Sequence, residues 1–325
     1  MSNLLLDTRE AGAKALVKLG TVNPNIVVLE ADLSQSSKTT FFSKKFPDRF
    51  FQMGIAEQNE FAVAAGMAMS GKIPFVSTYA VFATMKACEQ IRTYIAYPNL
   101  NVKIIASHGG LTPGKDGATH QAIEDLGIMR SIPNMTIIAP ADAIATESLV
   151  YAAVKIKGPV YIRLSRAALP VIYEMGNEFI IGKALELCQG LDATIIAIGD
   201  MVSWAVKVAE ELKKDNVSIR VIDMHTLKPL DREIVIKSAK ETGALITVED
   251  HNIYGGLGSA VAEVVAEEIP VPFKRVGIKD IFGESGEYHL LLDKYGLGVN
   301  DIKASVMEVI KNKKNKIWRD NYKKN

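Results

Sequence analysis

Cysteine is scarce in this chain, and long hydrophobic runs are absent. Only Cys88 and Cys188 occur among 325 residues, and they form no Cys-x-x-Cys pair. This excludes a disulfide framework and indicates a reducing compartment. No apolar stretch approaches the roughly 18 residues that a membrane span requires, and the N-terminal segment has the pattern of neither a signal peptide nor an anchor. We therefore expect a cytoplasmic protein that does not bind a membrane.

An excess of charge of one sign is missing as well. The chain carries 38 Lys and Arg against 37 Asp and Glu, a net charge of +1. Binders of nucleic acid need a sizeable basic field, so nucleic acid is not expected as a partner. Seven basic residues against one Asp give residues 311–325 a charge of +6, which leaves −5 on the rest. We interpret this basic tail as a solvated terminus.

Apolar residues are abundant, and they follow an alternating strand and helix pattern. They make up 48% of the chain, which excludes a disordered protein. Short apolar runs predict buried parallel strands, and helical patterns such as Thr8–Leu19 and Glu57–Met69 lie between them. The strands predicted in the first half are Ile26–Leu29, Pro74–Ser77, Val102–Ala106, Thr136–Ala139 and Val160–Leu164.

The periodicity lapses once and then resumes, which predicts two domains. At roughly 100–200 residues per domain the length allows two cores. We expect an α/β protein with two doubly wound domains and mainly parallel sheets, over residues 1–170 and 186–310, joined by a linker at 171–185. Ligands of such sheets bind where strands end, so the loops after the strands are the places to examine.

Two glycine-rich motifs resemble nucleotide-binding loops but depart from them. Gly109–Lys115 has the spacing of a P-loop, yet Asp116 stands where a Ser or Thr is needed, and Pro113 removes an N–H donor. Gly255–Gly258 precedes a helical pattern, but Val261 replaces the last glycine of a dinucleotide fingerprint. We interpret this second motif as a tight turn or an anion site at a helix N-terminus.

Histidines and an acid gather in the loop region after Val102–Ala106. His108 follows this strand directly, and Asp116 and His120 lie in a glycine-rich stretch that lets backbone approach a ligand. Histidine is the usual proton-transfer residue near neutral pH, although a lone histidine is more often a structural hydrogen-bonder. No His, Cys and carboxylate set has the spacing of metal ligands, so no metal site is predicted in this chain.

A carboxyl group and two aromatic residues follow other strands. Glu57 begins an apolar helical pattern, either as an acid that stabilises the helix dipole or as a carboxyl group suited to proton sharing. Tyr79 and Phe82 are either core residues or a stacking wall. Arg163 and Arg166 flank a strand end, where they suit either bidentate anion recognition or a surface ion pair.

Taken together, these motifs resemble the C-terminal half of transketolase, over nearly the whole chain up to the basic tail. The motifs are Gly54–Gln58, Asp116–Gln121, Arg130–Met135, Pro140–Asp142, Arg163–Arg166, Leu227–Asp231, Glu249–His251 and Gly255–Ala260. The resemblance implies a pyrimidine-binding domain at 1–170 and a transketolase C-terminal domain at 186–310. It also implies thiamine diphosphate as cofactor, bound between two domains that usually come from different protomers.

The resemblance assigns cofactor-binding roles to four residues. It implies that Glu57 shares a proton with N1′ of the aminopyrimidine, which promotes the imino tautomer that activates the thiazolium carbon. Phe82, with Tyr79 beside it, matches the aromatic wall on the pyrimidine ring, and Asp32 matches an acid near the cofactor.

The resemblance also assigns residues to the substrate. His108 and His120 match residues that hydrogen-bond substrate oxygens and assist proton transfer, and Asp116 matches one that reads a sugar hydroxyl. The residues that match the anchor for the distal phosphate are Arg9, Ser36 and Arg166.

One family motif is absent, namely the Gly-Asp-Gly that holds the diphosphate through a metal ion; the nearest sequence is Gly199–Met201. The resemblance therefore implies the C-terminal subunit of a split transketolase, which transfers a two-carbon ketol unit between sugar phosphates in the pentose phosphate pathway. An N-terminal partner chain would hold Mg²⁺ or Ca²⁺, in a heterotetramer with homodimer contacts. The alternatives are a 2-oxo acid dehydrogenase β subunit, half of a deoxyxylulose-phosphate synthase, or a non-catalytic assembly subunit.

Overall fold

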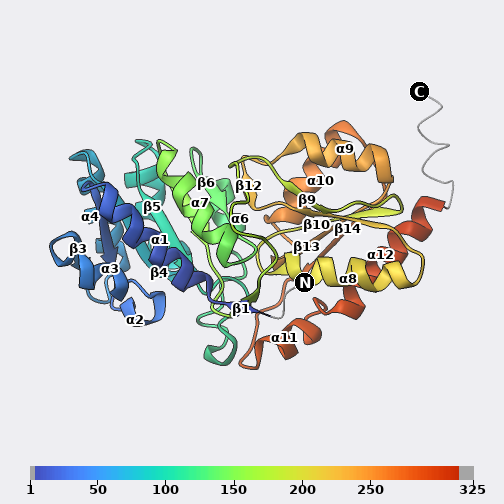
Figure 1. The fold of residues 1–325 in the computed structure, drawn as a ribbon, viewed down its shortest axis with the longest axis horizontal. Coiled ribbons are helices and arrows are strands. Elements are labelled where there is room, and N and C mark those ends of the chain that lie inside the picture. Colours follow the sequence, from blue (N-terminus) through green and yellow to red (C-terminus); the bar gives the residue numbers. More distant parts are fainter. Residues whose placement is uncertain (1–3, 315–325) are drawn as a thin grey trace.

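The computed structural model describes residues 4–314, which form two α/β halves side by side (Figure 1). A seven-stranded sheet with the order β12-β6-β7-β5-β4-β2-β3 builds the first half, and only β12 is antiparallel to its neighbour. Its strands are β2 (Ile26–Glu30), β3 (Phe50–Gln52), β4 (Ile73–Tyr79), β5 (Lys103–Ser107), β6 (Thr136–Ile138), β7 (Val160–Arg163) and β12 (Thr226–Lys228).

Both faces of this sheet are covered, because alternate residues of each strand point to opposite sides. Ile26 and Val28 of β2 belong to one hydrophobic cluster, and Val27 and Leu29 belong to the other. In the first half, the helices that contribute to the first cluster are α1 (Thr8–Val22), α3 (Thr40–Lys45) and α7 (Ala143–Lys155), and those that contribute to the second are α4 (Glu57–Met69), η2 (Phe82–Lys86), η3 (Ile91–Ala96) and α6 (Asp125–Ser131). Shorter elements are β1 (Leu5–Leu6), paired with β8 (Leu169–Pro170), and α2 (Ser34–Ser37), η1 (Pro47–Arg49), α5 (Cys88–Gln90) and η4 (Gly114–Asp116).

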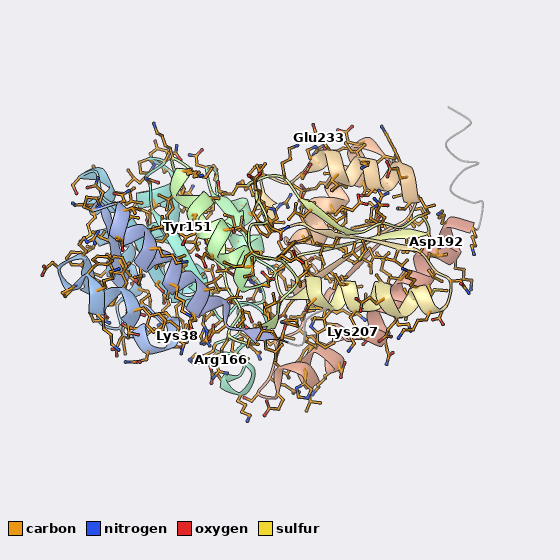
Figure 2. The ribbon with its side chains drawn as sticks, viewed as in Figure 1. Lys38, Tyr151, Arg166, Asp192, Lys207 and Glu233 are labelled. Carbon is orange, nitrogen blue, oxygen red and sulfur yellow. The ribbon has the colours of Figure 1, made fainter. Side chains whose placement is uncertain are left out.

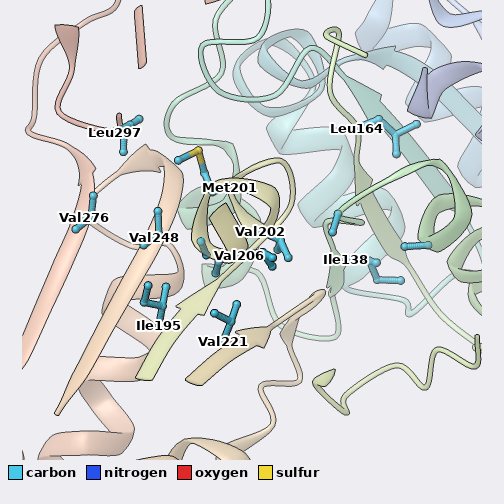
Figure 3. Packing of buried hydrophobic residues seen from close by; sticks show 14 of the residues in the cluster. Ile138, Leu164, Ile195, Met201, Val202, Val206, Val221, Val248, Val276 and Leu297 are labelled. Atoms are coloured by element: carbon cyan, nitrogen blue, oxygen red, sulfur yellow. The ribbon is translucent and has the colours of Figure 1, made fainter. Parts of the chain in front are cut away.

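The second half repeats this three-layer design around a five-stranded sheet with the order β14-β13-β10-β11-β9, in which β9 alone is antiparallel. Figure 3 shows Met201, Val202 and Val206 of one helix packed over the apolar face of this sheet. The strands are β9 (Leu185–Cys188), β10 (Ala193–Ala197), β11 (Ile219–Asp223), β13 (Leu245–Asn252) and β14 (Phe273–Ile278). The helices are α8 (Met201–Lys214), α9 (Arg232–Thr242), α10 (Leu257–Glu268), α11 (Tyr288–Lys294) and α12 (Val299–Lys314).

These observations confirm the predicted fold class of two α/β units with mainly parallel sheets. The helical segment after β4 is irregular, because the short helix α5 lies between the π-helical turns η2 and η3. Within the predicted linker at 171–185, Tyr173 and Phe179 are buried, with their ring centroids 4.8 Å apart. Among residues 4–314, no helix is long and apolar enough to cross a bilayer. Residues 311–314 of the predicted basic tail form the end of α12, and residues 315–325 lie outside the described residues.

Strand β12 joins the two halves, because it belongs to the sheet of the first half although it follows β11 of the second. Thr226 pairs with Ile138 of β6, and the His225 carbonyl accepts from the Ala139 N–H at 2.9 Å. A segment of the second half thus supplies the edge strand next to β6 in the sheet of the first half.

Arg163 forms the second connection, and it is neither a surface ion pair nor open to an anion. Its guanidinium is 5% exposed and donates to Asp125 Oδ2 at 3.0 Å, to the Ala122 carbonyl at 3.1 Å and to the Asp250 carbonyl at 2.8 Å. Burial lowers the pKa of this guanidinium, but the charges of Asp125, Asp250 and Asp200 together outweigh that effect. The net pKa is raised, so the guanidinium stays charged.

The glycines of the P-loop-like stretch are needed for this packing. A Cβ at Gly109 would lie 2.4 Å from Arg163 Nε, and one at Gly110 would lie 2.2 Å from Asp250 Oδ2. The next N–H, that of Leu111, donates to both carboxylate oxygens of Asp250 at 3.0 and 2.9 Å. In a P-loop, backbone N–H groups of this kind donate to phosphate; here the Leu111 N–H donates to the Asp250 carboxylate of the second half instead.

We predict that Arg163→Met lowers the free energy of unfolding by about 3–5 kcal/mol, because it leaves the buried Asp125 carboxylate without a cation. Urea unfolding followed by circular dichroism measures this loss. Arg166→Met is the control, since its ion pair is exposed and contributes at most about 1 kcal/mol. Equal effects of the two substitutions would contradict the proposed importance of the buried pair.

Candidate active site

The carboxyl ends of β2, β4 and β5 meet at one edge of the first sheet. These strands are neighbours and parallel, so the loops that follow them converge. Asp32 after β2 and His108 after β5 have φ values of 62° and 66°, which residues other than glycine adopt at an energetic cost. Strained backbone of this kind gathers at functional sites, so this edge is the place to look for one.

Four predicted site residues form one ring cluster at this edge, which we call the aromatic cluster. The His108 ring stacks on Tyr79 with centroids 3.7 Å apart, and Phe82 lies 5.4 Å from Tyr79. His120 meets Tyr79 and Phe82 edge-on at 6.1 and 5.6 Å. The structure thus brings together residues up to 41 positions apart in the sequence, from Tyr79 to His120.

His108 is fully buried and has a free hydrogen-bonding atom. Its Nδ1 lies 2.9 Å from Ser107 Oγ, and its Nε2 has no partner among the described residues. Burial, together with the charges of Arg9 and Arg166 and the nearby His120, lowers the pKa of His108 to about 3. The imidazole is therefore neutral near pH 7, and its unpartnered nitrogen can bond to a ligand.

Arg9 and Ser36 adjoin the aromatic cluster. Arg9 donates to the Ser36 carbonyl at 3.1 Å and to the Asp7 carboxylate at 3.1 and 2.7 Å, while the Tyr79 hydroxyl donates to Ser36 Oγ at 2.9 Å. Asp7 was not predicted as a site residue. Its sequence signal is its place as the N-cap of α1, two residues before Arg9.

Arg166 and Asp116 are half-exposed and pair with each other. Arg166 Nε lies 3.5 Å from Asp116 Oδ2, and Figure 2 shows Arg166 at the lower side of the molecule, between the two halves. Asp32 is exposed, and within the described residues no hydrogen bond or ion pair links its side chain to the aromatic cluster. Each predicted phosphate-binding arginine therefore has a carboxylate partner within the chain.

Glu57 lies in the first turn of α4 and is 4% exposed. Its Oε1 accepts from Lys86 Nζ at 3.1 Å, and this ammonium lies 4.2 Å from the centroid of the Phe82 ring. Lys86 was not predicted as a site residue, because nothing in its local pattern sets it apart from other surface lysines.

One turn further along α4, Glu60 is completely buried, and neither carboxylate oxygen meets a hydrogen-bond partner. Burial raises the pKa of Glu60 well above its usual range, and the charges of Glu30 and Glu57 add to this. Glu30 is held by its loop instead, since its carboxylate accepts from the Leu33 N–H and from Ser37.

These residues fit a flat nitrogen heterocycle. Glu57 is a buried carboxylate that can share a proton with a ring nitrogen, Phe82 offers a ring face, and His108 Nε2 needs a partner. Over residues 4–314, no group of three or more His, Cys, Asp or Glu side chains is arranged to hold a metal ion. Fold and residues together define a two-half α/β protein with a candidate ligand site at the edge of its first sheet.

Comparison with known proteins identifies the family. The family described as "Transketolase, pyrimidine binding domain" matches residues 5–171, and "Transketolase, C-terminal domain" matches residues 182–302. The chain belongs to the transketolase family, of which it carries these two domains, as the sequence motifs predicted. The pyrimidine-binding domain implies use of thiamine diphosphate.

Similar proteins match the chain nearly end to end. A putative transketolase C-terminal section from Methanocaldococcus jannaschii is 46% identical over 96% of this chain and 98% of its own length. A 6-deoxy-6-sulfo-D-fructose transketolase subunit from Clostridium sp. is 41% identical over 94% of this chain and 95% of its own. A solved split gene transketolase, described as an inactive β4 tetramer, shares 52% identity with a TM-score of 0.89 over 94% of this chain and 99% of that one.

We predict that His108 makes the chain sensitive to acid. Its pKa is lowered from 6.5 to about 3 in the folded protein, so the unfolded chain takes up the proton first, and stability is lost as the pH falls from about 6.5 towards 3. Between pH 7 and 5 this linkage costs about 2 kcal/mol. Urea unfolding measures the loss in the free energy of unfolding between pH 7 and pH 5. This loss should be smaller by about 2 kcal/mol in His108→Gln than in the wild type. An equal loss in both proteins would contradict a neutral His108.

Proposed function

We propose that this chain is the C-terminal subunit of a thiamine diphosphate-dependent transketolase, active with a partner that holds the diphosphate and the metal ion. The observation that carries the proposal is the buried Glu57 carboxylate beside the aromatic cluster, in a chain without a Gly-Asp-Gly motif. Residues 1–170 would act as the pyrimidine-binding domain and residues 186–310 as the C-terminal domain.

The chain's own residues would bind and orient the reactants. When bound, thiamine diphosphate supplies a thiazolium centre that stabilises negative charge on a substrate carbon. Glu57 holds the proton that it shares with the pyrimidine ring, and Tyr79 and Phe82 shield this ring from water. Because His108 is neutral, it acts through the hydrogen bond of Nε2 to a substrate oxygen rather than through a positive charge. His120, at the open edge of the aromatic cluster, is placed to move a proton.

The substrate class follows from the anchor. The Arg9 guanidinium uses three of its five N–H donors on Asp7 and Ser36, which leaves two for an anionic end group. Ketose and aldose phosphates carry such a group, and so does the 6-sulfo sugar in the name of the Clostridium relative. We therefore propose transfer of a two-carbon ketol unit between sugars with a terminal oxyanion, with Arg166 and Asp116 at the outer end of the substrate.

The partner is proposed to be an N-terminal transketolase subunit that binds Mg²⁺ or Ca²⁺. The Clostridium relative is itself described as a subunit, and the solved relative is a β4 tetramer described as inactive. We propose that two copies of this chain meet in a heterotetramer with two partner chains.

We predict that the purified chain alone, with thiamine diphosphate and Mg²⁺, turns over no ketose phosphate. Mixing with the partner chain copurified from the native host should produce activity with xylulose 5-phosphate and ribose 5-phosphate. The same complex assayed with pyruvate tests the rival assignment to a 2-oxo acid dehydrogenase. Robust turnover by the lone chain would refute the split-site proposal.

We further predict that Glu57→Gln lowers kcat of the reconstituted complex by about 10²–10⁴, because the amide cannot carry the shared proton. Glu89→Gln, an exposed change on α5, serves as the matched control and should leave kcat unaltered. Unchanged activity in Glu57→Gln would support a non-catalytic assembly subunit instead.

A further inference from the structure

Lys86 lies inside the candidate site, yet the proposed function gives it no role. Its Nζ contacts Glu57 Oε1 at 3.1 Å and lies 4.2 Å from the Phe82 ring centroid. The Lys86 side chain is 46% exposed, whereas the Glu57 side chain is 5% exposed. The ammonium group is therefore the cation that meets an otherwise buried carboxylate.

The ammonium occupies space that a bound pyrimidine would need. A ring that hydrogen-bonds Glu57 and stacks on Phe82 places its centroid roughly 4.5–7 Å from the Phe82 centroid. Lys86 Nζ already sits 4.2 Å from that centroid and within hydrogen-bond distance of the same carboxylate. Ring and ammonium cannot both hold these contacts, so one must displace the other.

The local structure permits this displacement. Phe82 and Lys86 are the first and last residues of the π-helical turn η2, which places both side chains on one side of the wide turn. Lysine has a long, flexible stem, and the half-exposed Lys86 can extend into solvent without disturbing the core. Glu57 is held within α4 and cannot follow it.

The pairing also gives the buried Glu57 carboxylate its counter-charge. An unpaired carboxylate at this depth would be costly, so a cation or a proton must accompany it. Glu60, one turn along α4, is an acid and offers no positive charge. Lys86 is the residue whose ammonium reaches the Glu57 carboxylate.

We propose that Lys86 is a positioning residue for cofactor loading: its ion pair holds Glu57 in place, and its ammonium competes with the aminopyrimidine of thiamine diphosphate for the same position. This inference rests on the proposed function, which supplies the ligand. It implies that the chain binds the cofactor less tightly than the contacts of the loaded site alone would allow, because the ion pair and the cation–π contact must first break.

The test measures cofactor affinity rather than turnover. Isothermal titration of thiamine diphosphate into the complex with the partner chain, at saturating Mg²⁺, gives Kd for the wild type and for Lys86→Met, which keeps the stem but removes the charge. We expect a Kd lower by roughly five- to tenfold in Lys86→Met, since the contacts to be broken are of that order. Lys86→Arg, which keeps a cation, should stay within about threefold of the wild type on the same scale.

Controls separate this inference from the proposed function. Lys72→Met, an exposed change in the loop after α4, should leave Kd unchanged. Lys86→Gln also removes the charge. It replaces Lys86→Met in the titration if Lys86→Met does not form the complex with the partner chain. An unchanged or higher Kd in the neutral variants would overturn the role of Lys86, whereas a wild-type complex that binds no thiamine diphosphate would overturn the proposed function itself.

Discussion

The buried guanidinium of Arg163 is the contact on which the arrangement of the molecule depends. It ends a central strand of the first sheet and bonds to the carbonyl of Asp250 in the second half, 87 positions away. The same Asp250 holds the Leu111 N–H, and two glycines make room between them. The loop that begins at His108 is therefore anchored to the second half, and the geometry of the site depends on how the two halves dock.

The charged side chains of the candidate site are paired with one another within the chain. Glu57 pairs with Lys86, Arg9 with Asp7, and Arg166 with Asp116. A ligand that binds these charged side chains must replace their present ion-pair partners. Its interaction with each side chain must therefore be stronger than the existing ion pair. An oxyanion and a proton-sharing heterocycle are the kinds of group that can make this exchange. The neutral His108 takes no part in it and can serve as a hydrogen-bonding surface.

Much of the fold could be predicted, because buried parallel strands leave a clear apolar signal. The strand at Ile26 and the helix from Glu57 to Met69 have the predicted places. Strand β12 could not be predicted, since its three residues carry little periodic signal and pair with a strand of the other half. Lys86 and Asp7 escaped prediction for a related reason: their role depends on a partner side chain, and a lysine near a helix or an aspartate at its cap is common anywhere on a protein surface.

The sequence by itself determined the alternation of strands and helices, the order of the family motifs and the absence of a diphosphate-binding motif, because these are properties of local pattern and composition. Only the tertiary structure decided which polar groups are buried and with whom they pair. Arg163 and Arg166 show the difference, since they lie three positions apart and fit the same sequence interpretation. One closes a buried junction and the other is half-exposed, because strand β7 ends at Arg163 and Arg166 lies in the loop beyond it.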